Sequence, residues 1–225
     1  MKEYKTITRV YSGSLKQAVE DAYEEMLQPD SEFPFIINCR NFIPGILAYD
    51  NGTQRYAIFN SIRRRLFSKY GITEYPTACA LGSVGETYIL SYTRARTPAS
   101  FFENPNQVSA FLYPEKYGQP LFSRAGRHNN NLLISGTASI VDSETVHVGD
   151  IRAQTLQTLQ NMTTLKGSPL DDSLKYHIYV KDSRDNEVVR DICYENGISG
   201  TIINVDVCRD DLLVEIEAYS KDLNI

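Results

Sequence analysis

The sequence lacks the patterns that mark several large functional classes. Its four cysteines (Cys39, Cys79, Cys193 and Cys208) are far apart with no CxxC pair, and its three histidines are scattered, so a zinc site is not expected. No apolar run approaches the length of a membrane span, and the N-terminal MKEYKTITRV has no signal-peptide pattern. These absences predict a cytoplasmic protein with reduced thiols.

Motifs for nucleic-acid, phosphate and acyl-transfer chemistry are missing too. The net charge is −5, with one dense basic run at residues 63–65, which disfavours non-specific binding to nucleic acid. There is no GxSxG motif, so Ser139 is not an obvious nucleophile. The stretch GSVGET lacks the Lys-Ser/Thr ending of a phosphate-binding loop. We therefore expect neither nucleic acid nor a membrane as a partner.

What the sequence does contain is a similar alternation of helix and strand patterns in each half. The first half reads helix, strand, helix, strand, strand, starting from a capping box at Ser14 and Gln17. The second half reads strand, helix, strand, helix, strand, strand, with Asp150 as a helix cap and Gly197 as a stop. Apolar residues make up 42% of the chain, enough for a real core. We predict an α+β fold of two related sheet-plus-helix units, with helices covering one face of each sheet.

Residues 97–131 differ from both halves because they show no period. The segment is rich in proline, asparagine, glycine and aromatic residues. Unstructured connections of this length are usually functional or disordered, and the aromatic residues argue against disorder. We interpret the segment as a functional bridge between the two units.

The segment LLVEIEA (212–218) holds the most suggestive acidic residues. Strand alternation places Leu213, Glu215 and Glu217 on one face. In one interpretation both glutamates face water. In the other, one of them lies in a cleft, where partial burial favours the neutral carboxyl and lets it donate a proton near neutral pH. The pattern alone leaves both interpretations open.

Arginines gather in and beside the aromatic middle of the chain. A guanidinium can bind a carboxylate through two parallel hydrogen bonds, although a single arginine is more often a solvated surface charge. The candidates are Arg55, Arg63, Arg94, Arg96 and Arg124. Arg124 is the strongest of these, because it follows Phe122 at the entry to the strand that contains SGTAS.

The SGTAS segment offers close backbone approach at Gly136 and hydroxyls at Thr137 and Ser139. Its small residues could equally serve packing within a buried strand. Together with the arginines and the glutamate strand, they predict a cleft for a small carboxylic acid.

Three long segments carry a family resemblance. ENPNQVSAFLYPEKYGQPLFSRA, ISGTASIVDSETVHVGDIRAQTLQTLQNM and VCRDDLLVEIEA together resemble the chorismatase family, in particular its FkbO/Hyg5-type 3-hydroxybenzoate synthases. The resemblance runs from about residue 33 to about residue 219. It implies two RidA/YjgF-like (chorismate-mutase-like) units, the first one truncated. We expect a partial unit over 1–110, a bridging loop over 111–131 and a C-terminal unit over 132–225.

The resemblance also implies roles for individual residues. Glu215 matches the catalytic glutamate of the family. The residues that match substrate-binding positions are Arg63, Arg96, Arg124, Tyr113, Tyr117, Gly136, Thr137, Ala138 and Cys208. No metal and no organic cofactor is implied.

The activity implied by the resemblance is release of pyruvate from the enolpyruvyl ether of chorismate. Cys208 resembles the aromatising branch, which makes 3-hydroxybenzoate, sometimes with 4-hydroxybenzoate. The alternative is a hydrolase that forms a dihydroxycyclohexadiene carboxylate. A three-fold assembly, such as a homotrimer, is a further expectation from the RidA-like units.

Two other classes stay open at this stage. A non-catalytic RidA-like protein that binds a small cyclic carboxylate is favoured by the short region of some thirty residues before FPFIINCRNF, since family members have a much longer one. A RidA-like deaminase is disfavoured, because those enzymes place a carboxylate-binding arginine where residues 197–201 have none.

Overall fold

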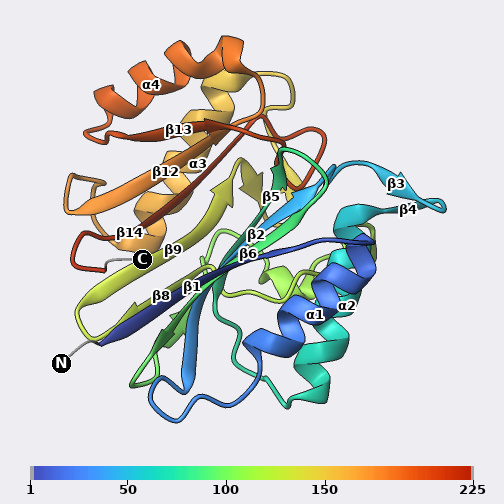
Figure 1. The fold of residues 1–225 in the computed structure, drawn as a ribbon. Helices are drawn as coiled ribbons and strands as arrows, with labels where there is room; N and C mark the ends of the chain where they lie inside the picture. Colours follow the sequence, from blue (N-terminus) through green and yellow to red (C-terminus); the bar gives the residue numbers. More distant parts are fainter. Residues whose placement is uncertain (1–2, 224–225) are drawn as a thin grey trace.

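The first half of the chain forms a four-stranded sheet with two helices on one face (Figure 1). The computed structural model describes residues 3–223. The strands run in the order β1-β6-β2-β5. The elements are β1 (Tyr4–Tyr11), α1 (Leu15–Met26), β2 (Phe35–Pro44), the hairpin β3 (Tyr49–Asp50) and β4 (Thr53–Gln54), α2 (Arg55–Lys69), β5 (Thr77–Ser83) and β6 (Tyr88–Ala95).

The second half forms a six-stranded sheet in the order β13-β12-β14-β9-β8-β7, again with two helices on one face. Its strands are β7 (Ser100–Phe102), β8 (Ala125–His128), β9 (Asn131–Ala138), β12 (Leu174–Val180), β13 (Gly200–Asn204) and β14 (Val214–Ser220). Its helices are α3 (Ile151–Lys166) and α4 (Asn186–Glu195). Short elements complete the chain: η1 (Ala110–Leu112), η2 (Glu115–Tyr117), η3 (Ser183–Asp185) and the hairpin β10 (Ile140–Val141) with β11 (Glu144–Thr145).

The two units share one topology. In each, a strand, a helix, a strand, a helix and two strands follow in order, and the sheet order places the last strand beside the first. Strands β2 and β5 pair in parallel, as do β12 and β13, while the remaining pairs of the shared four strands are antiparallel. The first unit lacks counterparts of β7 and β8. The predicted α+β fold, with a truncated first unit, is confirmed.

The residues that the sequence predicted to begin or end helices do so in the structure. Ser14 Oγ accepts a hydrogen bond from the backbone N–H of Gln17 at 3.3 Å, and Asp150 Oδ1 accepts one from the N–H of Ala153 at 3.0 Å. Both satisfy a donor that the first turn of a helix leaves free. Gly197 ends α4 with a φ of +77°, a conformation that glycine adopts without steric cost.

Two elements differ from the sequence prediction. Strand β1 was not predicted, because it is an edge strand exposed at most positions, so its alternation is weak. The segment 97–131 is not wholly a bridge, since β7 and β8 lie within it and pair in the second sheet. The division into 1–110, 111–131 and 132–225 therefore stays a proposal, and β7 falls inside its first range.

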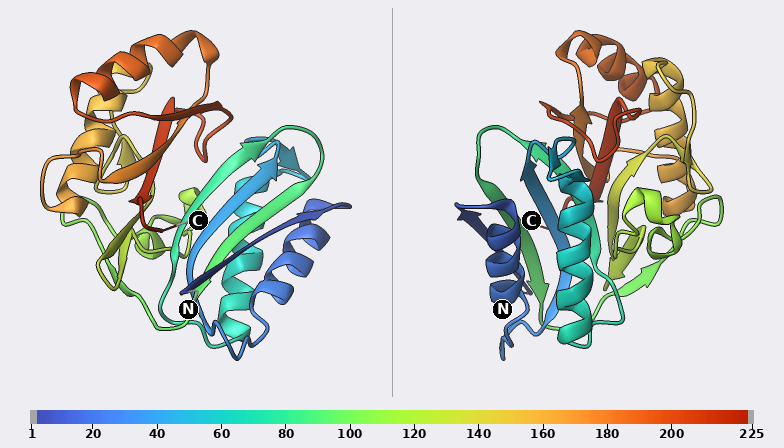
Figure 2. Two further views of the ribbon diagram at one scale, coloured as in Figure 1. Left: turned by 60° about the vertical axis from the view of Figure 1, so that its left-hand side comes forward. Right: turned by 90° about the vertical axis from the view of Figure 1, so that its right-hand side faces the viewer.

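The helix-free sides of the two sheets face each other, with the helices outside (Figure 2). Strand β5 contacts β9, and the backbone N–H of Ala78 donates to Ser135 Oγ at 2.9 Å. The N–H of Gly82 donates to the carbonyl of Asp206 at 2.7 Å. The polar residues of the candidate site lie along this contact. No helix between residues 3 and 223 has the length and apolar character needed to cross a bilayer.

Candidate active site

Glu215 lies in the middle of the contact between the two sheets. It sits on β14, is 3% exposed, and pairs in register with Ala138 of β9. A Cβ atom at the neighbouring Gly136 would lie only 2.0 Å from Glu215 Oε1 and 2.8 Å from Cys79 Cβ. The expected close approach at Gly136 is therefore an approach to the glutamate itself, and any larger residue would displace the carboxyl group.

Two small adjoining cavities meet at Glu215. Each has a volume of about 30 Å³, which is room for roughly one water molecule. The residues that line both are Tyr56, Phe122, Gly136, Cys208 and Glu215. Because they share these walls, we treat the two cavities as one site.

The carboxyl group of Glu215 is neutral at physiological pH. Burial, followed by the nearby charge of Glu217, raises its pKa to about 8, although Arg124 acts in the opposite direction. Both glutamates of the strand are buried, so the interpretation in which they face water is wrong. A buried carboxyl with a pKa near 8 can serve as a general acid at neutral pH.

Cys208 lies beside this acid. Its Sγ is 4.0 Å from Glu215 Oε2. Desolvation, followed by the Glu215 carboxyl, raises the pKa of Cys208 to about 12. The residue is therefore a neutral thiol at physiological pH, not a thiolate nucleophile.

Arg63 contributes a buried positive charge without a negative partner. The residue is 1% exposed, and its guanidinium carbon lies 5.2 Å from the ring centroid of Phe67 and 5.8 Å from that of Phe59. Its Nε and Nη2 atoms are buried without a hydrogen-bond partner among residues 3–223. An unpaired buried cation is costly, so this arrangement indicates a place for an anionic ligand.

Arg124 enters the site from the opposite wall. It is 3% exposed, and its Nη2 donates to the carbonyl of Val108 at 3.1 Å and to the hydroxyl of Tyr113. Its Nε is buried without a hydrogen-bond partner in the part of the chain that the structure describes. The guanidinium is thus fixed in position by neutral groups and keeps its charge available to a ligand.

Sequence reasoning missed Arg209, a third arginine of the site. Its guanidinium carbon lies 3.5 Å from the ring centroid of Tyr117 and 5.1 Å from that of Tyr113. Its Nη1 donates to the carbonyl of Ser143 at 2.9 Å. The only signal for Arg209 was its position next to Cys208. Tyr56 was missed as well, because it looked like part of an apolar helix face.

Most of the predicted site residues come together. The ones that line the cavities are Arg63, Arg124, Tyr113, Tyr117, Gly136, Ala138, Cys208 and Glu215. Arg96 is not among them, because it lies past the end of β6, where its Nη2 is 2.5 Å from Glu32 Oε1. Thr137 is not among them either, because strand alternation turns it away from Gly136 and Ala138, and its hydroxyl donates to the carbonyl of Ser135.

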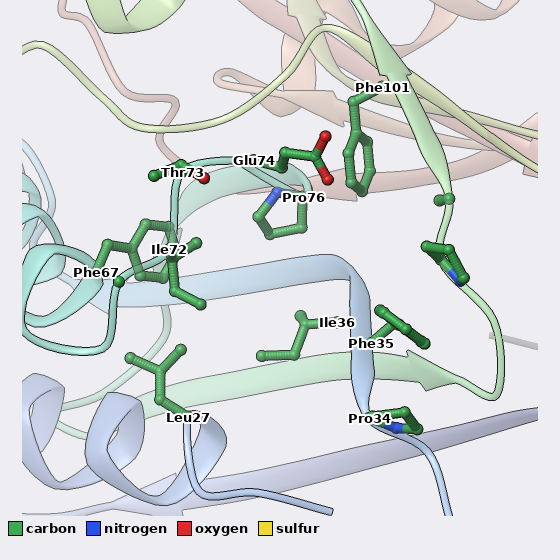
Figure 3. Close-up of a pocket in the computed structure, with 13 residues that line it drawn as sticks. Leu27, Pro34, Phe35, Ile36, Phe67, Ile72, Thr73, Glu74, Pro76 and Phe101 are labelled. Carbon is green, nitrogen blue, oxygen red and sulfur yellow. The ribbon is translucent and has the colours of Figure 1, made fainter.

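A larger cavity of about 350 Å³ lies elsewhere, near the start of β2 and close to β7 (Figure 3). Its walls are mainly apolar, with Phe35, Ile36 and Phe101 among them, and Glu74 is the only ionisable residue in its lining. A negative charge repels a carboxylate. This cavity therefore does not suit the ligand class that the arginines indicate.

Comparison with known proteins agrees with this geometry. The family model described as "Chorismatase FkbO/Hyg5-like, N-terminal" matches residues 3–93. The chain is 31% identical over 238 residues to a 3-hydroxybenzoate synthase of Streptomyces hygroscopicus, covering 92% of this chain and 70% of that relative. It spans 64% to 70% of the curated chorismatase-type relatives it matches.

Structural comparison gives the same picture. A chorismatase crystal structure superposes with a TM-score of 0.90 at 26% identity, covering 98% of this chain and 75% of the other. About half of the chain also matches a single-unit relative. A RutC family protein of Pyrococcus horikoshii is 32% identical over 120 residues, covering 48% of this chain and 94% of that protein.

Proposed function

Because the chain belongs to the FkbO/Hyg5-like chorismatase family, we propose that it converts chorismate and releases pyruvate, with Glu215 as the general acid. The observation that supports this most directly is the state of Glu215. Its carboxyl is buried beside a cavity, and its pKa of about 8 keeps it protonated at neutral pH. The neighbouring arginines provide positive charge for an acidic substrate.

Chorismate matches the charges of the site. It carries two carboxylates and an enolpyruvyl ether arm. Arg63 and Arg124 approach the cavity from different elements, so each can hold one carboxylate, with a charge-assisted contact contributing about 1.5–3 kcal/mol. Arg209 adds a third positive group at the aromatic wall. Holding the arm near the acid supplies an orientation advantage as well.

The proposed reaction begins with proton transfer. Glu215 donates its proton to the methylene carbon of the enol ether, which becomes a methyl group and leaves an oxocarbenium-like centre. In the hydrolytic route, water attacks that centre and gives one proton to the Glu215 carboxylate, and the hemiketal then collapses to pyruvate while the ring oxygen keeps the other proton. In the aromatising route, the neighbouring ring hydroxyl attacks instead and gives its proton to the Glu215 carboxylate. The cyclic ketal then loses its bond to the ring carbon that carried the hydroxyl, the adjacent ring carbon loses its hydrogen as a proton, and collapse of the hemiketal releases pyruvate and leaves the phenol. General acid catalysis of this kind contributes about 10²–10⁴-fold.

Cys208 bears on the choice of product. We propose 3-hydroxybenzoate, with or without 4-hydroxybenzoate, because the chain is 31% identical to a 3-hydroxybenzoate synthase and because Cys208, whose Sγ lies 4.0 Å from Glu215 Oε2, resembles the cysteine of the aromatising branch. A hydrolase that gives a dihydroxycyclohexadiene carboxylate is the alternative. The two differ in the product that remains after pyruvate has left.

Substrate entry requires a local opening. A cavity with room for about one water molecule cannot hold a six-membered ring with two carboxylates. Tyr113 and Tyr117 line the cavity from the segment around η1 and η2, which contains little regular structure. We propose that this segment moves outward to admit chorismate and then closes over it.

One experiment tests the proposal. The purified chain is incubated with chorismate, pyruvate is followed with lactate dehydrogenase, and the ring product is identified by chromatography. We expect stoichiometric pyruvate and 3-hydroxybenzoate. Tight binding of chorismate without any product would instead support a non-catalytic binder, and ammonia release from an enamine substrate would support a deaminase.

Three further expectations belong with this proposal. The homotrimer suggested by the RidA-like units is tested by light scattering on the purified chain. The absence of nucleic-acid and membrane partners and the cytoplasmic location stay predictions from the sequence. The substrate-binding roles of Arg96 and Thr137 are not retained, because neither residue lines the cavity.

A further inference from the structure

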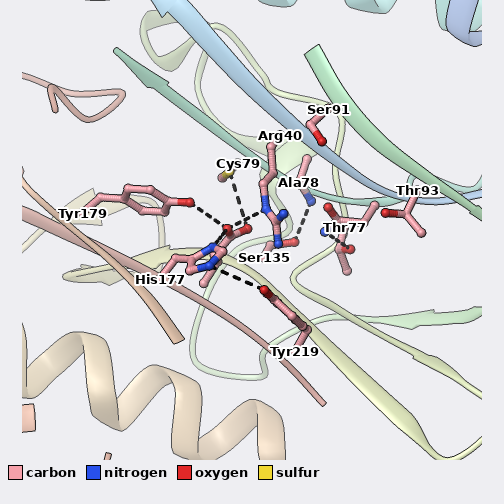
Figure 4. Close-up of polar contacts among 12 residues, drawn as sticks. Arg40, Thr77, Ala78, Cys79, Ser91, Thr93, Ser135, His177, Tyr179 and Tyr219 are labelled. Atoms are coloured by element: carbon pink, nitrogen blue, oxygen red, sulfur yellow. Dashed lines mark hydrogen bonds and ion pairs between the residues drawn. The ribbon is translucent and has the colours of Figure 1, made fainter. Parts of the chain in front are cut away.

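A second buried carboxylate, Glu217, lies two residues beyond the acid on the same face of β14. It is 1% exposed. Arg40 Nε, from β2 of the first unit, lies 2.6 Å from Glu217 Oε1. The hydroxyl of Tyr179 donates to the same oxygen at 2.7 Å, and His177 Nδ1 lies 2.9 Å from it (Figure 4). Cys79 Sγ is 3.7 Å from the other oxygen.

These contacts hold Glu217 in its ionised form. Burial by itself would raise its pKa, but the charge of Arg40 and the hydrogen bonds from His177 and Tyr179 outweigh burial and lower the pKa. Among residues 3–223, Glu215 has no ion pair or short hydrogen bond of this kind, and with a pKa of about 8 it stays neutral. One strand therefore presents a fixed negative charge and a protonated acid side by side.

We propose that Glu217 is a positioning residue whose charge, fixed by Arg40, keeps the proton on Glu215. Residues two apart on one face of a strand are separated by about 6.6–6.8 Å, close enough for a strong interaction where water is excluded. Arg40 reaches Glu215 only through this pair. Arg40 of the first unit would thus act on the acid of the second unit without touching it.

Other charged or titratable groups face the two glutamates and also influence whether each one is protonated. Those around Glu215 are Tyr56 and Arg63 of α2, Cys79 of β5, and Arg124, Tyr113, Cys208 and Arg209 from the connecting segments. Those around Glu217 are Arg40, Cys79, His177 and Tyr179, with Tyr219 behind His177. The proposal concerns the pair Glu217 and Arg40, because Arg40 holds the charge of Glu217 that acts on Glu215.

The test is a titration of the Glu215 carboxyl by NMR in protein labelled with ¹³C at glutamate, with Glu215→Gln used to assign its signal. Glu217→Gln removes a negative charge, so the titration of Glu215 should move down by about one pH unit. Arg40→Gln removes the charge that holds Glu217 ionised, so Glu217 should bind a proton more readily and the titration of Glu215 should move down as well. Glu25→Gln is the matched control, because Glu25 also pairs with an arginine, Arg9, but at the surface.

The outcomes show whether Glu217 affects the protonation of Glu215 or only stabilises the fold. If Glu217→Gln lowers the melting temperature but leaves the Glu215 titration in place, the proposal is overturned. If the variants do not fold, the wild-type spectrum still decides, because Glu217 must stay ionised from about pH 5 upward, and a Glu217 signal that titrates near neutral pH would contradict it. The role in catalysis rests on the proposed function, and chorismate turnover in the same samples tests that part. A protein without turnover would still show the shift in the spectrum.

Discussion

The two units of the molecule share a topology but present different chemistry where they meet. In the second unit, the last strand, β14, carries Glu215 and Glu217 on its inner face. In the first unit, the corresponding strand is β6, and Ser91 and Thr93 stand there. Ser91 pairs in register with Arg40, so it lies on the face that meets the second unit. Its hydroxyl accepts a hydrogen bond from the hydroxyl of Thr8. Unlike the carboxyl groups of β14, this hydroxyl does not ionise.

This difference shows that the site depends on asymmetry between two similar units. The second unit supplies the acid, on β14, and the small residues beside it, on β9. The first unit supplies positive charge, through Arg40 on β2 and Arg63 on α2, and the phenol of Tyr56. The second unit also carries Arg124 and Arg209 beside the acid, but Arg63 and Arg40 come from the first unit, so the full set of charges in the site requires both units.

The largest expected effect comes from removing the acid. Glu215→Gln keeps the size of the side chain but removes the proton that is transferred, so pyruvate release should fall by about 10²–10⁴-fold while the protein stays folded. The coupled pyruvate assay and a circular-dichroism melt measure the two properties. Unchanged turnover would remove Glu215 as the acid and with it the assigned role of the second unit.

The next effect concerns the space beside the acid. Gly136→Ala would place a methyl group 2.0 Å from Glu215 Oε1, so the carboxyl must shift. A misplacement of about 1 Å can cost about 10²-fold in rate, and we expect a loss of that size in kcat. Gly82→Ala in the first unit is the control. Its Cβ would lie 3.0 Å from Asp206 Cβ, so it should lower the melting temperature but spare kcat.

A smaller effect, on KM for chorismate, should distinguish Arg63, which lines the cavity, from Arg96, which does not. Arg63→Met removes a charge whose Nε and Nη2 atoms have no hydrogen-bond partner among residues 3–223, so KM for chorismate should rise by about 10- to 100-fold, corresponding to about 1.5–3 kcal/mol, with little loss of stability. Arg96→Met removes a residue that pairs with Glu32 away from the cavity and should change KM less than twofold. Steady-state kinetics on both variants measure this contrast. Equal effects would place the substrate elsewhere.

The smallest effect is a dependence on pH that originates in the second unit. Because the pKa of Glu215 is about 8, the acid is lost above that pH, and kcat/KM should fall about tenfold per pH unit there. The pKa is raised above its unfolded value of about 4.3. The stabilising contribution of the group is therefore complete below that value and is lost as pH rises through about 8. Urea midpoints at about pH 6 and about pH 9 measure it, and Glu215→Gln should remove both dependences. A kcat/KM that stays flat across this range would contradict the assignment.

The sequence was sufficient for most of the architecture and for the face of the strand that carries Glu215, the residue we propose as the acid. Alternation along LLVEIEA identified the face that carries Glu215, and the helix signals at Ser14, Asp150 and Gly197 marked the helix ends. The long resemblance added the family and most of the pocket. These features are determined by residues that lie close together in the sequence, so a single segment is enough to predict them.

The sequence was insufficient where a residue's role depends on the other unit. Spacing alone could not separate Arg63 from Arg96, because only the packing of the two sheets decides which one faces the cavity. Arg209 lies in a connection without any period, and its partner Tyr117 is distant in sequence. The division of labour between Glu215 and Glu217 likewise depends on Arg40, which comes from the first unit.

The stacking of Arg209 on Tyr117 has a consequence for the turnover rate. It joins the segment before β8 to the connection before β14, and both residues line the cavity beside Glu215. A contact of this type contributes only about 0.5–2 kcal/mol, so it breaks and re-forms without unfolding either sheet. Under the proposed opening of this segment, product release requires this contact to break, and turnover that slows in viscous solution would show that release limits the cycle.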